Sequence, residues 1–290
     1  MGVLIMAIHS LSYHPKKRKI RINLAYLILI PASLAALLPF IWMIFGSFKT
    51  GAEIRQIPPT FFPKEFTLDN YRRVLSDPEL PLGIFYKNSA IIAFANVIQV
   101  LFTSSLLGYI FAKFEFKSKK YIFWFIMATM MIPSQMTMIP GYLILAKLGL
   151  INNLLGLIIP AAIDAFGIFL FRQFSHSIPN ELIDAARVDG AGEFKIFYRI
   201  VLPQLGPALA TFGMLTFMFN WNAYLWPLIV LTEKNVRTLP IVLTWFSSRM
   251  VNNDHYTMAA SVLVILPVLI VFLFAQKWIV EGITLSGMKG

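Results

Sequence analysis

Charged residues and cysteine are what this 290-residue sequence has least of. Only 13% of its residues are charged, whereas 58% are hydrophobic and the mean hydropathy is +0.70, values that a soluble domain rarely reaches. It contains no cysteine, which excludes disulfides and thiolate metal sites. It also lacks the P-loop pattern Gly-x-x-x-x-Gly-Lys-Ser/Thr and the zinc pattern His-Glu-x-x-His. We therefore expect no catalytic site, metal site or cofactor in this chain.

Long uncharged runs dominate instead. A helix needs ~20 apolar residues to cross ~30 Å of hydrocarbon, and runs of that length favour helices over a barrel. Six runs reach or nearly reach it, at 22–48, 88–112, 121–146, 154–171, 201–231 and 256–276. The sequence thus predicts an all-α, polytopic membrane protein with six transmembrane helices.

Lysine and arginine predict the orientation of these helices. The net charge of +11 could indicate a nucleic-acid partner, but the bases flank the apolar runs, so membrane orientation explains them better. They are most numerous in the alternate set of loops that includes both termini and segment 178–203. We expect that set to be cytoplasmic, which divides the chain into a basic tail 1–21, a first helix 22–48, an external loop 49–87, a core domain 88–276 and a C-terminal tail 277–290.

The external loop 49–87 is longer than a plain connector. It holds five prolines and one amphipathic piece, 68–75. Two interpretations fit it equally: a docking surface for an external protein, or a packed cap over the helices. Segment 233–255 raises the same question.

One polar stretch, 178–203 (IPNELIDAARVDGAGEFKIFYRIVLP), interrupts the apolar pattern. Pro179 and Glu181 suit the first turn of a helix, and Leu182, Ala185 and Ala186 share one side of it at helical spacing. The two alanines make that side shallow. A Gly-Ala-Gly break follows, then a second short helix, and Leu202-Pro203 opens the next apolar run.

This stretch resembles the cytoplasmic EAA loop of permease subunits of binding-protein-dependent ABC importers. The matching positions are Asp184-Ala185-Ala186, three residues, Gly190, nine residues, Ile200, one residue, and Leu202-Pro203, with Asp184 in place of the usual Glu. An amphipathic helix lying on the membrane surface is the alternative, although it leaves this spacing unexplained. The resemblance implies an ATPase-coupling role for Glu181, Asp184, Ala185, Ala186, Gly190, Ile200, Leu202 and Pro203.

The resemblance extends from about residue 70 to the C-terminus. Segments 219–228 (FNWNAYLWPL) and 237–240 (RTLP) are similar to carbohydrate-uptake permeases. Within that group they resemble the second, six-span permease of the maltose importer. It implies a second permease subunit, two copies of a cytoplasmic ABC ATPase carrying ATP-Mg, an external solute-binding protein, and the plasma (inner) membrane of a bacterium or archaeon. The implied solute is a sugar or related polyol.

Polar residues inside the apolar runs are candidates for the translocation path. Asp164 is the one charge near the middle of a run, where a carboxylate is costly and usually functional; it could also be protonated or paired with a partner permease. Asn220, Trp221 and Asn222 combine amides with an aromatic face, which suits sugars, but asparagines also join helices. We expect Asn96 and Gln99 to join helices. An ion-gradient-driven secondary transporter is the alternative function, and only Asp164 would serve it.

Overall fold

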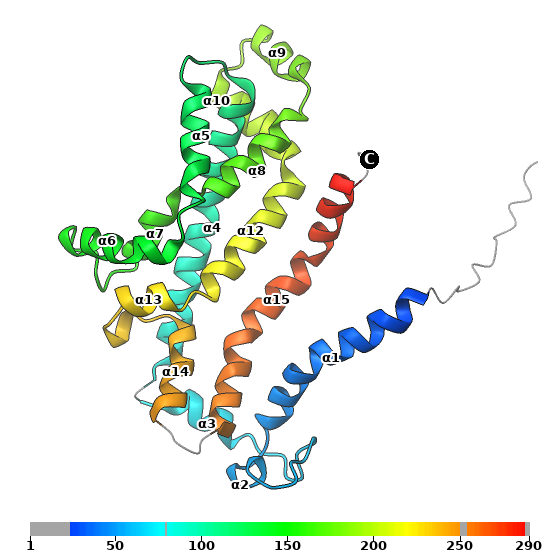
Figure 1. Ribbon diagram of the computed structural model, residues 1–290, viewed down its shortest axis with the longest axis vertical. Helices are drawn as coiled ribbons and strands as arrows, with labels where there is room; N and C mark the ends of the chain where they lie inside the picture. Colours follow the sequence, from blue (N-terminus) through cyan, green and yellow to red (C-terminus); the bar gives the residue numbers. More distant parts are fainter. Residues whose placement is uncertain (1–23, 79, 250–253, 288–290) are drawn as a thin grey trace, which may run out of the picture. The chain divides into compact units, whose positions relative to one another are not determined.

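The computed structural model describes residues 24–78, 80–249 and 254–287, and within those ranges it is built from helices without a strand (Figure 1). This confirms the predicted all-α class. The helices are α1 Leu24–Gly46, α2 Gly51–Ile54, α3 Asp69–Ser76, α4 Leu82–Lys113, α5 Lys119–Thr129, α6 Ser134–Lys147, α7 Leu155–Ile158, η1 Ile159–Ala162, α8 Ala165–His176, α9 Asn180–Val188, α10 Glu193–Ile196, η2 Phe197–Val201, α11 Leu202–Gln204, α12 Gly206–Trp221, α13 Leu225–Val230, η3 Lys234–Val236, α14 Leu239–Arg249 and α15 Asp254–Gly287. The predicted tail 1–21 lies outside the described residues.

Chain contacts divide the protein into two units, Met1–Trp42 and Met43–Gly290. The described part of the first unit belongs to α1. All of its side chains over 26–40 are exposed, and most of them are apolar. A helix that is apolar all round requires an apolar solvent or a large core, which agrees with a membrane span.

Only three of the expected spans are single helices. Among the described residues, Tyr26–Gly46, Leu82–Lys113 and Asp254–Phe274 are each long and apolar enough to cross a membrane. The other three candidates are helix pairs with a bend of 98° between α5 and α6, 41° between η1 and α8, and 81° between α11 and α12. The six predicted runs are therefore present as apolar helical segments, but half of them are broken.

Each break has a local cause. Pro133 and Asp164 precede α6 and α8 with extended backbones, which end the preceding helical path. Leu205 ends α11, and a Gly-Pro pair then begins α12. The expected fifth run, 201–231, is consequently divided among η2, α11, α12 and α13, and Leu202-Pro203 lies before the bend instead of opening the span.

Helix α4 is the centre of the second unit. It packs along α8 and α12, and α12 packs in turn on α15. It begins at Leu82, six residues before the expected start of the second span, and α15 continues to Gly287, into the expected C-terminal tail. These contacts enclose two large apolar clusters.

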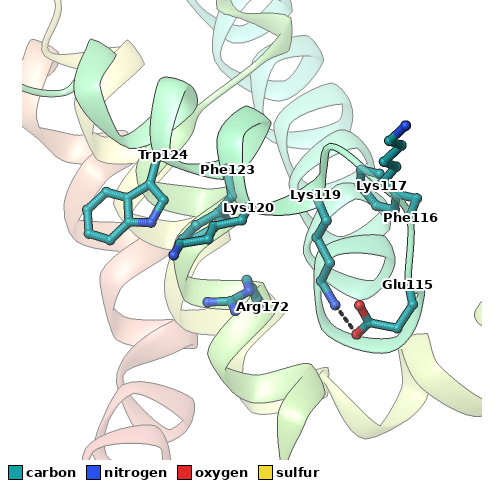
Figure 2. A pocket seen from close by; sticks show the side chains of 8 residues that line it. All are labelled: Glu115, Phe116, Lys117, Lys119, Lys120, Phe123, Trp124 and Arg172. Atoms are coloured by element: carbon teal, nitrogen blue, oxygen red, sulfur yellow. Dashed lines mark hydrogen bonds and ion pairs between the residues drawn. The ribbon is translucent and has the colours of Figure 1, made fainter.

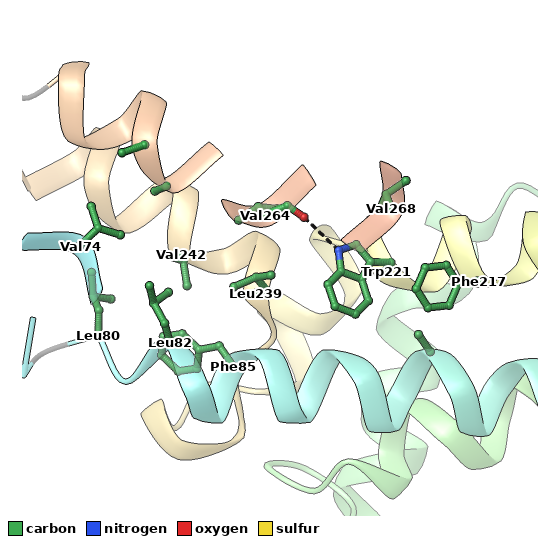
Figure 3. Packing of buried hydrophobic residues seen from close by; sticks show 13 residues of the cluster. Val74, Leu80, Leu82, Phe85, Phe217, Trp221, Leu239, Val242, Val264 and Val268 are labelled. Atoms are coloured by element: carbon green, nitrogen blue, oxygen red, sulfur yellow. Dashed lines mark hydrogen bonds between the residues drawn. The ribbon is translucent and has the colours of Figure 1, made fainter. Parts of the chain in front are cut away.

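We call the first the Trp221 cluster (Figure 3). Its residues come from the segment 74–85, from α4, α12, α14 and α15, and include Val74, Phe85, Phe217, Trp221, Leu239 and Val264. We call the second the Phe197 cluster. It joins α4, α8 and α12 to the polar stretch, and includes Tyr109, Phe171, Ile183, Ile196, Phe197 and Val201.

Segment 49–87, which the sequence predicts to be external, packs on the helices through one face of α3. Helix α3 forms where the amphipathic piece was expected and packs against α15, with Val74 fully buried. The Asn70 amide donates hydrogen bonds of 2.8 Å to the carbonyl oxygens of Ser47 and Lys49. Packing of this face agrees with the cap interpretation, while Leu75 and the arginines of α3 remain on the exposed side.

Candidate functional site

Helix α9 is closed at its C-terminal end by the Gly190 turn. The Ala191 amide donates to the carbonyl of Ala186 at 2.9 Å, and the Gly190 amide donates to that of Arg187 at 3.0 Å. This pair of bonds is a Schellman motif, in which the first residue after the helix cap adopts the left-handed conformation. Gly190 has a φ of +77°, and no other atom lies within 4 Å of the position its Cβ would take. Glycine is therefore required here by backbone conformation and not by space.

The two sides of α9 have different surroundings. Ile183 is 2% exposed and Ala186 is half-buried, and both pack in the Phe197 cluster. Leu182, Ala185 and Val188 lie on the exposed side, with Val188 87% exposed. The predicted sharing of one side by Leu182, Ala185 and Ala186 is therefore wrong for Ala186, which packs inward because Ile183 draws its side of the helix onto the cluster.

The guanidinium of Arg187 joins α9 to α10, and we call its contacts with Asp184 and Glu193 the Arg187 bridge. Arg187 donates to Asp184 on its own helix at 3.0 Å and to the two carboxylate oxygens of Glu193 at 2.7 and 3.3 Å. The hydrogen bond to Glu193, partly opposed by desolvation, raises the pKa of Arg187 above its usual value. The Tyr109 hydroxyl of α4 also donates to Glu193, at 3.4 Å. Asp184, the expected coupling residue, is thus already engaged within the chain.

The second half of the motif forms one continuous helical segment. Helix α10, the π-helical segment η2 and α11 run continuously to the 81° bend before α12. Ile200 and Leu202 pack at the edge of the Phe197 cluster, and Pro203 is exposed. At the other end of α9, the Lys113 ammonium of α4 donates to the Ile178 carbonyl and to Asn180. Both ends of α9 are therefore tied to the helices of the bundle.

An amide cluster lies between α4, α12 and the α7–η1 segment. The Asn96 amide donates to the Asn220 side chain at 2.5 Å and to the Leu157 carbonyl at 3.4 Å. The Gln99 amide donates to Asn96 at 2.7 Å and to the Ile158 carbonyl. The prediction that Asn96 and Gln99 join helices is confirmed, and Asn220 belongs to the same network.

The other candidate path residues, Asp164, Trp221 and Asn222, differ in how exposed they are. Asp164 is half-exposed and caps α8, accepting from the Gly167 amide at 2.6 Å. Trp221 is 3% exposed, and its indole N–H donates to the Val264 carbonyl of α15 at 3.1 Å (Figure 3). Asn222 is exposed just after α12. Asp164 and Asn222 are therefore accessible on the surface of this chain, whereas Trp221 is part of the helix packing.

Sequence reasoning missed the pairing of Arg187 with Glu193. The two are six residues apart, outside the spacing at which helical neighbours meet, and only the Gly190 turn brings them together. The available signal was an acid and a base on either side of a glycine break. Among the described residues, no group of three or more His, Asp or Glu side chains could hold a metal ion.

Comparison with known proteins agrees with this geometry. The family described as "Binding-protein-dependent transport system inner membrane component" matches residues 104–285. An arabino-oligosaccharide transport system permease protein of Halalkalibacterium halodurans is 36% identical over 88% of this chain and 92% of its own length. A lactose transport system permease protein of Rhizobium radiobacter is 35% identical over 92% and 96%, and an sn-glycerol-3-phosphate permease protein of Pectobacterium atrosepticum is 32% identical over 89% and 94%.

A solved structure has the same fold. A chain of a bacterial ABC transporter involved in the import of the acidic polysaccharide alginate superimposes with a TM-score of 0.80, at 28% identity, covering 88% of this chain and 95% of that one. A second alginate transporter chain, at 14% identity and a TM-score of 0.59, shares the fold alone. The match over most of the chain, together with relatives more than 30% identical along nearly their whole length, shows that this chain belongs to the inner-membrane permease components of binding-protein-dependent ABC transport systems.

Proposed function

We propose that this permease forms half of the translocation path of an ATP-driven importer for a sugar or related polyol. The proposal is supported by family membership together with one structural observation: the closed, two-sided helix α9, which offers an exposed apolar stripe at one end of the bundle. The relatives are named for arabino-oligosaccharides, lactose and sn-glycerol-3-phosphate, which all carry more than one hydroxyl group.

In this proposal the stripe of Leu182, Ala185 and Val188 docks in a groove of a cytoplasmic ATPase. Ala185 lets the two surfaces approach closely, and Glu181 lies beside the stripe in the first turn. ATP-Mg binds in two copies of the ATPase, and their closure moves α9. Since ATP binding can shift the equilibrium only through contacts that differ between the states, the docking contacts must change strength when the dimer closes.

The Arg187 bridge then carries that movement into the membrane. It fixes α9 to α10, and α10 continues through η2 and α11, with Ile200, Leu202 and Pro203, to the bend before α12. Because Ile183 and Ala186 are packed in the Phe197 cluster, a displacement of α9 also moves the inner ends of α4 and α8. Gly190 keeps the angle between α9 and α10 fixed.

The path itself would use Asp164 and Asn222, with Asn220 and Trp221 behind them. Asp164 has a second carboxylate oxygen beyond the one that caps α8, and this oxygen can accept a hydrogen bond from a solute hydroxyl. Asn220 would contribute through the amide cluster, and Trp221 by holding α12 against α15.

The proposed assembly contains a second permease, two ATPase subunits and an external solute-binding protein. Both termini and segment 178–203 face the cytoplasm. Lys113 bonds to Asn180 of α9, and α5, which begins with Lys119 and Lys120, starts at the end of the bundle where α9 lies (Figure 1). This concentration of bases supports the orientation.

Purification of the tagged chain from its native host in mild detergent tests this function. We expect an ABC ATPase and one second permease to be recovered with it and identified by mass spectrometry, and the associated binding protein then identifies the solute. A chain that purifies alone in several detergents, with uptake that survives ATP depletion but fails with a proton uncoupler, would support an ion-gradient-driven secondary transporter instead.

A further inference from the structure

A basic pocket lies where α5 begins, next to α8. Its volume is about 450 Å³, within the ~300–1,000 Å³ typical of small-molecule sites. Four cationic side chains line it, those of Lys117, Lys119, Lys120 and Arg172, and the further lining residues are Glu115, Phe116, Phe123 and Trp124 (Figure 2). Glu115 is the single carboxylate among them. The balance of charge therefore favours an anion.

The pocket is a built site and not a chance gathering of lysines. Arg172 is half-buried, donates to the Phe111 carbonyl at 3.2 Å and lies over the Phe123 ring at 4.3 Å from its centroid. Lys119 pairs with Glu115 at 2.8 Å, with the Lys119 side chain only 16% exposed. Two of the four cations, Lys119 and Arg172, are thus held in place before any ligand arrives, which lowers the entropy cost of binding.

The start of α5 adds to the positive potential. Its first turn holds two lysines and no acid, and Ser118 forms no side-chain cap. Lysines at the positive end of a helix dipole are unfavourable, and an anion placed there is stabilised by both the dipole and the unpaired amides. The two lysines therefore interact unfavourably with the start of α5 unless an anion is bound there.

The surface beyond the pocket is apolar. None of the side chains described for α5 is buried. Tyr121, Trp124 and Phe125 are each at least 65% exposed. Figure 2 shows the Trp124 ring beside the Lys120 side chain. A soluble phosphate would use only the basic groups, whereas a phospholipid would also cover these aromatic side chains, which are typical of the membrane interface.

We propose that this pocket binds the phosphate headgroup of an anionic phospholipid, with the acyl chains lying along α5. Basic pockets between membrane helices on the cytoplasmic side are suited to such headgroups. Lys119, Lys120 and Arg172 hold the phosphate, and Glu115 limits the affinity. This site is separate from the path residues and from the docking stripe of α9.

Native mass spectrometry of the full chain with its co-purified subunits tests the proposal. The complex is stripped of lipid, then titrated with dioleoyl-phosphatidylglycerol, dioleoyl-phosphatidylcholine or inorganic phosphate. We expect phosphatidylglycerol to bind at least tenfold more tightly than either of the others. Each lysine near an anionic lipid is worth about a fivefold change in affinity, so Lys119→Gln/Lys120→Gln should weaken phosphatidylglycerol binding about 25-fold.

Two further variants make the result specific. Lys87→Gln/Lys147→Gln removes the same charge from exposed positions outside the pocket and should leave affinity unchanged. Glu115→Gln should tighten binding, because it removes the opposing carboxylate. Equal affinity for the two lipids, an unchanged affinity in the pocket variant, or full displacement of lipid by inorganic phosphate at equal concentration would each overturn the proposal.

Discussion

The Trp221 cluster and the Phe197 cluster are both apolar, but different polar contacts close them. Around the first, buried donors bond to neighbouring segments: Trp221 to the Val264 carbonyl at 3.1 Å, and the Leu239 amide to Ser89 at 2.8 Å. Around the second, the Arg187 bridge uses side chains that are 38–64% exposed. Buried bonds are costly to break, whereas exposed ion pairs exchange readily with water. The Trp221 cluster is therefore closed by bonds that are costly to break, whereas the bridge that fixes α9 to α10 beside the Phe197 cluster can rearrange at a lower cost.

Trp221→Ala should have the largest effect on stability. Removing a buried tryptophan leaves a cavity and removes its hydrogen bond to the Val264 carbonyl, and we expect a loss of about 3–5 kcal/mol. The measurement is thermal unfolding of the purified complex. Trp221→Phe keeps the stacking on Phe217 and should lose much less. An equal loss in both variants would mean that the Val264 hydrogen bond, and not packing, holds α12 to α15.

Gly190→Val should affect coupling more than stability. A β-branched residue in the left-handed region costs about 1–2 kcal/mol, which is enough to open the turn in many molecules. We expect solute uptake to fall about tenfold while the chain still inserts in the membrane. Gly190→Asn is the matched control, because asparagine tolerates this conformation. If valine and asparagine give the same uptake, the Gly190 turn is not part of coupling.

Arg187→Gln should reduce coupling between ATP hydrolysis and transport while changing stability very little. The bridge is partly exposed, so its loss should cost no more than about 1 kcal/mol of stability. We expect more ATP to be hydrolysed per solute molecule transported, because α9 and α10 are no longer fixed together. Arg72→Gln removes a comparable i,i+3 pair, Arg72–Asp69, from α3 and should leave that ratio unchanged. A ratio unaffected by Arg187→Gln contradicts the role given to the bridge.

The smallest effect concerns Glu53 in segment 49–87. Burial raises the pKa of this carboxyl, but hydrogen bonds from the Thr60 hydroxyl and the Lys64 amide outweigh it, so the pKa lies below its ordinary 4.5. Its stabilisation is therefore complete above about pH 4.5 and fades as the pH falls through the lower, folded value. Limited proteolysis of the loop should become faster in that acidic range, and Glu53→Gln should abolish this pH dependence.

The sequence predicted the parts of this fold that depend on local chemistry. The helical class follows from apolar length, and the start of α9, its end and the place of Gly190 follow from capping and backbone preference. The bends before α6, α8 and α12 were not predicted, because hydropathy measures the length of an apolar run and not its direction.

Residue environments were harder to predict than elements. Trp221 and Asn222 are adjacent, yet one is buried and the other exposed, which is decided by the packing of α15 and α4 around α12. Ala185 and Ala186 differ in the same way because Ile183 packs in the Phe197 cluster. The basic pocket escaped notice because Arg172 lies far from Lys119 and Lys120 in sequence.

Thiol labelling of position 185 tests the docking of α9 most directly. Since the chain has no cysteine, Ala185→Cys introduces a unique thiol on the exposed side of α9. Inside-out vesicles carrying the complex are labelled with a membrane-impermeant maleimide, with the ATPase present or stripped away. Ser118→Cys, at an exposed position of the loop between α4 and α5 on the same side of the membrane, serves as the control. We predict that the ATPase slows labelling at position 185 at least tenfold and leaves the labelling rate at position 118 unchanged. Equally fast labelling of Ala185→Cys with and without the ATPase would contradict the docking of α9.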